Sequence, residues 1–112
     1  MKISIKATNL ILTPALKSHI NDKMGTLEKY LREVNEIKVE AERERKHKTG
    51  DVFRAEVMLI VRGKVMRAET KTDDMYSAID LVVPKLKEQI SKFKDRKSDL
   101  IKKGARRAKR EV

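Results

Sequence analysis

Apolar residues recur at two different spacings along this chain of 112 residues, and the change of spacing limits the folds that it can form. Every second residue is apolar in four segments, which is typical of strands with one buried face. In two longer segments the apolar residues lie three or four positions apart and form one stripe on a helix. The strands are expected at residues 2–7, 37–42, 52–62 and 65–71, and the helices at 14–31 and 75–93.

This order of segments predicts an α+β fold of the type β-α-β-β-β-α. In such a two-layer sandwich, both helices cover one face of a four-stranded sheet. The chain shows no internal repeat and no long linker, so we expect a single folded domain.

Short signals mark the ends of the segments. Thr13-Pro14 predicts a helix start, with a threonine cap and a proline in the first turn. Thr72-Asp73-Asp74 offers hydroxyl and carboxylate caps to the second helix. Gly63 lies in a connection so short that the strands on either side of it should pair antiparallel. The charged residues 43–50 are expected to form an extension that leads into a turn.

Gly25 and Pro84 are residue types that are unfavourable inside the helices predicted to contain them. Gly25 costs about 1 kcal/mol relative to alanine in a helix, and we expect it to permit a close approach to the sheet. Pro84 removes the hydrogen bond to the carbonyl group of Asp80, so it should kink the second helix.

Composition excludes several classes of protein. The chain has no cysteine, so disulfides and thiolate metal sites are excluded. No apolar run approaches the roughly 20 residues of a membrane span, and the N-terminus does not resemble a signal peptide. These features favour a soluble protein of the reducing cytoplasm, without a membrane partner.

Catalytic chemistry finds little support in the sequence. The only histidines are His19 and His47, and neither has a partner at a spacing typical of a metal site. The acids Asp73 and Asp74 are adjacent at a helix start, where caps are the usual role. The four glycines are scattered and form no phosphate-binding loop. We therefore predict a protein that is not an enzyme, with no cofactor, no metal and no small-molecule substrate.

Positive charge is the strongest functional signal. The chain has a formal net charge of +11, and residues 85–112 contain 12 Lys and Arg against four acids. On the second helix Lys85, Lys92 and Arg96 share one flank, while Lys87 and Lys94 lie beyond the other. This excess predicts a nucleic acid or a ribosome as the partner, recognised through phosphates and shape because aromatic residues are few. A membrane-surface helix is disfavoured because the apolar stripe must cover the sheet.

Residues 74–80 read Asp-Met-Tyr-Ser-Ala-Ile-Asp and are followed by Leu-Val-Val-Pro-Lys-Leu-Lys-Glu-Gln-Ile through residue 90. This segment resembles the signature of the ribosome hibernation promoting factor family, which includes the ribosome-associated translation inhibitor. Asn9, residues 13–16 and residues 27–30 extend the resemblance, which covers about residues 2–97.

The resemblance implies a fold similar to the double-stranded RNA-binding domain. It also implies binding to the small ribosomal subunit in the mRNA channel and decoding region, where the protein would block mRNA and the A- and P-site tRNAs and preserve idle ribosomes. The partners would be 16S-type rRNA phosphates and neighbouring ribosomal proteins. Basic positions of the family match Lys23 and Lys29 in the first helix and Lys85, Lys92 and Lys94 in the second. We add Arg96 to these expected rRNA contacts, because it shares a flank with Lys85 and Lys92. The rival hypothesis is a general RNA- or DNA-binding module that acts away from the ribosome.

The chain departs from the family pattern at three positions. Glu88 stands where a basic residue is usual, Pro84 replaces an Asp or Asn, and Lys64 replaces the second glycine of a hairpin turn. Long members of the family add a linker and a dimerising domain, which this chain does not contain. It therefore resembles a short form or the N-terminal domain of a long one.

The last residues are basic and carry few apolar side chains. We predict a ribosome-binding domain over residues 1–100 and a basic, disordered tail over residues 101–112. The tail is either a solubilising end, the start of a linker, or an arm that lies along rRNA phosphates.

Overall fold

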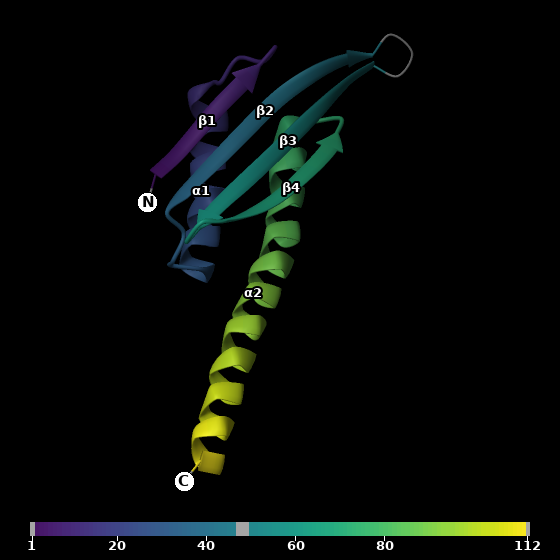
Figure 1. The fold of residues 1–112 in the computed structure, drawn as a ribbon. Helices are drawn as coiled ribbons and strands as arrows, with labels where there is room; N and C mark the ends of the chain where they lie inside the picture. The colour runs from purple at the N-terminus through teal and green to yellow at the C-terminus, as the bar shows by residue number, and fades with distance from the viewer. Residues whose placement is uncertain (1, 47–49, 112) are drawn as a thin grey trace.

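The computed structural model describes the backbone of residues 2–46 and 50–111, and the side chains of residues 2–45 and 50–95. It confirms the predicted order of elements (Figure 1). These elements are β1 (Lys2–Thr8), α1 (Pro14–Tyr30), β2 (Glu36–Lys46), β3 (Gly50–Val61), β4 (Lys64–Thr72) and α2 (Met75–Glu111).

The four strands form one mixed sheet in the order β1-β2-β3-β4. Strand β1 pairs parallel with β2, because helix α1 carries the chain back between them. The pairs β2-β3 and β3-β4 are antiparallel, and the pairing of β3 with β4 confirms the prediction made from the short connection at Gly63. Both Arg62 and Gly63 adopt a positive φ in that turn, at 46° and 79°.

The core lies between the two helices and one face of the sheet (Figure 1). The sheet contributes inward-facing residues such as Val57 and Leu59, both fully buried. The predicted helix stripes are also confirmed. The buried helix residues are Leu16, Ile20, Met24 and Leu27 on α1, and Met75, Ala78, Ile79, Val82, Val83, Leu86 and Ile90 on α2. The other face of the sheet is left without a covering layer.

Both predicted helix starts are capped as the sequence indicates. The Thr13 hydroxyl accepts a hydrogen bond from the amide of Leu16 at 3.2 Å, and Pro14 is the first helical residue. At the start of α2, the Asp74 carboxylate accepts a hydrogen bond from the amide of Ser77 at 3.1 Å. Each cap satisfies an N–H group that the first turn of a helix cannot pair.

The strands on either side of residues 47–49 are longer than the sequence indicates. Strand β2 continues to Lys46, past the expected end at residue 42, and β3 begins at Gly50 instead of residue 52. The Arg43 guanidinium bonds the Asp51 carboxylate at 2.8 Å across these extensions. Gly25 does not serve a close approach to the sheet, because a Cβ atom built there meets no heavy atom within 4 Å.

Helix α2 continues beyond residue 100, where the sequence predicts that folding ends, and reaches Glu111. Alanine, lysine and arginine favour helices, so the composition of this segment agrees with a helical backbone. The side chains beyond residue 95 lie outside the described residues, and the division into a domain and a tail stays a prediction. The helix also continues through Pro84, which lies on its exposed side. Within the described part of the chain, no helix is long and apolar enough to cross a membrane.

Candidate nucleic-acid interface

The uncovered face of the sheet neutralises much of its own charge. Arg54, only 15% exposed, lies at the centre of four carboxylates. Its guanidinium nitrogens lie 2.7 Å from Glu56, 3.2 Å from Glu42, 3.3 Å from Glu69 and 3.5 Å from Glu40. Burial lowers the pKa of Arg54, but the hydrogen bond to Glu69 and the surrounding negative charges outweigh burial and raise it. The Arg54 charge is therefore fully engaged within the sheet.

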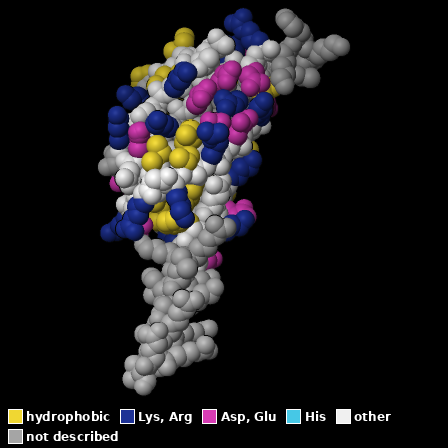
Figure 2. All heavy atoms as spheres, in the orientation of Figure 1, with side chains coloured by type: hydrophobic (Ala, Val, Ile, Leu, Met, Phe, Trp, Pro, Cys, Tyr) yellow, Lys and Arg dark blue, Asp and Glu magenta, His cyan; other side chains and the backbone are white. Residues whose placement is uncertain are grey.

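Two further strand cations on this face also pair with carboxylates. Arg67 lies 3.8 Å from Glu56, and Lys71 lies 3.5 Å from Glu44. Figure 2 shows this face, with carboxylates and cations intermixed around a small apolar patch. A polyanion approaching this face would meet carboxylates as often as cations, so the face is a poor site for phosphates.

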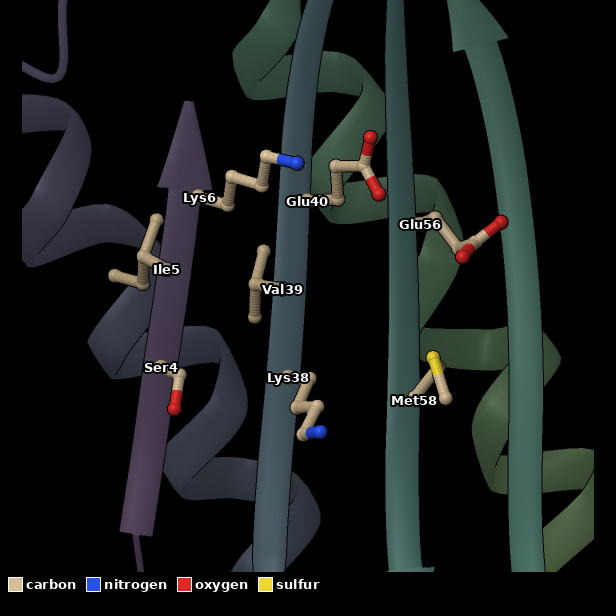
Figure 3. A pocket seen from close by; sticks show the side chains of 8 residues that line it. All are labelled: Ser4, Ile5, Lys6, Lys38, Val39, Glu40, Glu56 and Met58. Atoms are coloured by element: carbon tan, nitrogen blue, oxygen red, sulfur yellow. The ribbon is translucent and has the colours of Figure 1, made fainter. Parts of the chain in front are cut away.

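A shallow hollow of about 220 Å³ lies on the same face, across β1, β2 and β3 (Figure 3). Its side chains include Lys6 and Lys38, but also Glu40 and Glu56, with Met58 beside them. The mixture of charges makes this hollow unsuitable for phosphate groups.

The predicted contact residues all belong to the helix layer instead. Lys23 and Lys29 lie on α1, and Lys85, Lys92 and Lys94 lie on α2. Arg96 is also in α2, but its side chain lies outside the described residues.

Two predicted contacts lie on the flank of α2 that faces β4. Lys85 donates a hydrogen bond to the backbone carbonyl of Glu69 at 3.1 Å. Lys92, two turns further on, is 69% exposed and lies 3.4 Å from Glu88. Lys64, the first residue of β4, lies in the same groove as Lys92. The fold thus brings Lys64 to the flank that Lys85 and Lys92 share, which spacing along the sequence does not predict.

The opposite flank of α2 meets the end of α1. Lys94 donates a hydrogen bond to the backbone carbonyl of Tyr30, and its ammonium lies 4.4 Å from the centre of the Tyr30 ring. The ammonium of Lys87 lies 5.8 Å from the same ring centre. These cation–π contacts join the two helices and keep two positive charges at their outer surface.

Asp80 joins the helices nearer to their N-terminal halves. Its carboxylate lies 2.7 Å from His19 Nε2 and 3.7 Å from the ammonium of Lys23. The His19 ring also meets the Tyr76 ring edge-on, with 5.0 Å between ring centres. His19 and Asp80 therefore pair across the two helices. Spacing could not reveal this pair, because 61 residues separate its members.

The predicted contacts differ in what they already bond within the molecule. Lys85 and Lys94 bond backbone carbonyls, Lys23 is partly balanced by Asp80, and Lys92 pairs with Glu88. Lys29 is exposed on α1. Among the described residues, no group of three or more His, Asp and Glu side chains is placed to hold a metal ion.

Residues 3–98 match the model of the family described as sigma 54 modulation protein / S30EA ribosomal protein. The chain belongs to this family. The match covers nearly all of the sandwich, and the resemblance to the ribosome hibernation promoting factors is confirmed by relatives that bear that name.

Two curated relatives are called ribosome hibernation promotion factor. The one from Lactococcus lactis subsp. cremoris is 38% identical over 102 residues, which are 86% of this chain and 51% of the relative. The one from Staphylococcus aureus is 32% identical over 100 residues, which are 86% of this chain and 50% of the relative. The chain spans about half the length of these relatives.

Two solved structures share the fold. A ribosomal subunit interface protein from Coxiella burnetii superposes with a TM-score of 0.73 at 24% identity, covering 85% of this chain and 99% of that protein. The N-terminal domain of Protein Y from Thermus thermophilus superposes with a TM-score of 0.65 at 28% identity. The superposition covers 83% of this chain and 99% of that domain. The two-layer β-α-β-β-β-α sandwich is therefore an architecture that both solved structures share.

Proposed function

We propose that this chain is a ribosome hibernation factor that binds the small ribosomal subunit in the mRNA channel and decoding region. There it would exclude mRNA and the A- and P-site tRNAs by occupying their space, which inhibits translation and preserves idle ribosomes. The names of the curated relatives support the ribosome as the partner. The mechanism needs a rigid body and phosphate contacts, and no catalytic residue.

One observation carries this proposal: the molecule separates its charges by layer. The sheet face pairs Arg54, Arg67 and Lys71 with carboxylates, whereas the helix layer displays lysines on both flanks of α2. Helices α1 and α2 together contain 15 Lys and Arg against seven acids, so a polyanion such as rRNA is attracted more strongly to the helices than to the sheet. The proposed contacts are Lys23, Lys29, Lys85, Lys92, Lys94 and Arg96, with action in the cytoplasm where ribosomes work.

Cosedimentation with purified small subunits tests the proposal. We expect strong association at low salt and a steep loss as salt rises, because each neutralised phosphate releases counterions. Absence of association at low salt would overturn the proposal.

Competition with free duplex RNA in the same assay distinguishes ribosome binding from general RNA binding. Free duplex RNA in moderate excess should leave the protein on the small subunit. Displacement by the duplex would support the rival function, a general RNA-binding module.

A further inference from the structure

The sheet has two edges, and helix α2 covers only one of them. Strand β4 forms that edge, where the Lys85 ammonium donates a hydrogen bond to the carbonyl of Glu69 at 3.1 Å. The side-chain amide of Gln89 donates to the carbonyl of Arg67 at 2.7 Å. Both acceptors are main-chain groups that an added strand would need, so α2 blocks strand addition at β4.

Strand β1 forms the other edge, and its outward backbone groups are open. The amide of Lys2 donates to the carbonyl of Asn35 at 3.3 Å, so the Lys2 backbone faces β2. Backbone groups alternate in direction along a strand, so the N–H and C=O groups of Ile3, Ile5 and Ala7 face away from β2. Among the described residues, no side chain bonds these groups. The β1 edge therefore presents unpaired donors and acceptors to an incoming strand.

The inner face of β1 is incompletely covered. Ile3, Ile5 and Ala7 on this face are half-buried. Their register partners on β2 are at most 2% exposed, because β1 and β3 lie on either side of them. A strand added beside β1 would cover the three side chains with its own alternate residues. The edge therefore favours a strand whose inward side chains are apolar.

The outer face of the same edge is positive. Lys2 and Lys6 of β1 are exposed on this face, and Lys38 of β2 lies in register with Ser4 between them (Figure 3). Within residues 2–45 and 50–95, no ion pair engages any of these three ammonium groups. Opposite charges on facing residues of neighbouring strands attract, whereas like charges repel. The edge therefore favours a strand whose outward side chains are carboxylates.

We propose that the β1 edge binds an extended protein segment in which carboxylate and apolar side chains alternate. Main-chain hydrogen bonds to Ile3, Ile5 and Ala7 hold this segment as a further strand of the sheet. A second copy of this chain fits less well, because antiparallel pairing of two β1 strands about Ser4 would place Lys2 of one copy opposite Lys6 of the other. The edge is separate from the proposed rRNA contacts, which all lie on the helices.

Amide hydrogen exchange of the whole chain, followed by NMR, tests whether the edge is open. In the free protein the amides of Ile3, Ile5 and Ala7 should exchange quickly, whereas those of Ser4 and Lys6 exchange slowly because they face β2. The probe is the synthetic peptide Thr-Glu-Val-Glu-Ile-Glu-Val-Thr, with both ends capped. Saturating peptide should slow exchange of the three outward amides by about tenfold or more.

Two proline variants test recognition through the backbone, with binding measured by fluorescence anisotropy of the labelled peptide. Ala7→Pro removes one outward N–H without removing a hydrogen bond to β2, so it should weaken binding by about tenfold. Val65→Pro makes the same kind of change at the covered β4 edge and should bind the peptide as the wild type does.

A charge reversal tests recognition through the side chains. The double variant Lys2→Glu/Lys6→Glu should lose the acidic peptide and should prefer a peptide in which lysine replaces each glutamate. Lys64→Glu/Lys87→Glu changes the net charge equally at exposed positions away from β1, and it should keep the preference for the acidic peptide. The double variant of β1 keeps every backbone group, so it decides the test if Ala7→Pro does not fold.

Four results would overturn the proposal. Slow exchange of the outward amides in the free protein would show that the edge is already closed. Absence of peptide binding, or equal binding of the acidic and basic peptides, would contradict the proposed partner. Binding that neither Ala7→Pro nor the double variant of β1 weakens would place the peptide elsewhere. A dimer of the protein alone that Ala7→Pro dissociates would show that a second copy occupies the edge.

Discussion

At the scale of single residues, burial separates the side chains that hold the fold from those free to meet a partner. Leu86 is fully buried on α2, whereas Lys92, two turns away, is 69% exposed. Leu86→Ala should lower the free energy of unfolding by about 2–5 kcal/mol, measured by urea denaturation, because it leaves a cavity. Lys92→Ala should keep the melting temperature and weaken cosedimentation with small subunits. If both variants act only through stability, the β4-side flank of α2 is not a binding surface.

Lys94 should differ from Lys29 although both are predicted contacts. Lys94 donates a hydrogen bond to the carbonyl of Tyr30 and lies over its ring, so it also joins α2 to α1. Lys94→Ala should therefore lower the free energy of unfolding by about 0.5–1.5 kcal/mol, in addition to weakening binding. Lys29→Ala should weaken binding alone. Equal thermal melting curves for the two variants would show that the Lys94 hydrogen bond contributes nothing to stability.

At the scale of elements, the strands β2, β3 and β4 are joined by the cluster around Arg54. Removing the guanidinium leaves the carboxylates of Glu40, Glu42, Glu56 and Glu69 close together without their shared cation. Arg54→Ala should lower the free energy of unfolding by about 1–3 kcal/mol. Binding of the folded variant to small subunits should match the wild type, since this face is not the proposed interface. Loss of binding without loss of stability would place the sheet at the interface.

The basic C-terminal segment of α2 allows a prediction from its sequence. Residues 102–110 contain six cations and no acid. If this segment lies along rRNA phosphates, deletion of residues 102–112 should make binding less sensitive to salt. The slope of the logarithm of the binding constant against the logarithm of the salt concentration should fall by about 0.7 to 0.9 for each phosphate that the segment neutralises. The shortened chain should still block tRNA at higher concentration, because the folded sandwich does the excluding. An unchanged slope would show that the segment makes no phosphate contact.

The elements themselves were predictable because their signals are local. The stripes of α1 and α2, the caps at Thr13 and Asp74, and the turn at Gly63 each depend on residues within a few positions of one another. The strand ends were less exact: β2 continues to Lys46, past the expected end at residue 42, because charged residues occupy both faces there and hide the alternation.

Contacts between distant segments could not be predicted from spacing. The His19–Asp80 pair and the Lys94–Tyr30 contact join residues more than 60 positions apart. The open space beside Gly25 could not be predicted from the sequence either, because it depends on which face of α1 the rest of the fold leaves uncovered.

At the scale of the whole molecule, charge and steric exclusion together explain the proposed action. The sheet face carries cations that pair with carboxylates of the same face, whereas the helix layer is basic. The molecule is therefore expected to dock through its helices and to fill the space that tRNA needs. The most direct measurement is the binding of labelled P-site tRNA to mRNA-programmed small subunits as this protein is added. Steric exclusion predicts that tRNA leaves as the protein binds and that no subunit holds both. Subunits that carry the protein and tRNA together would contradict it.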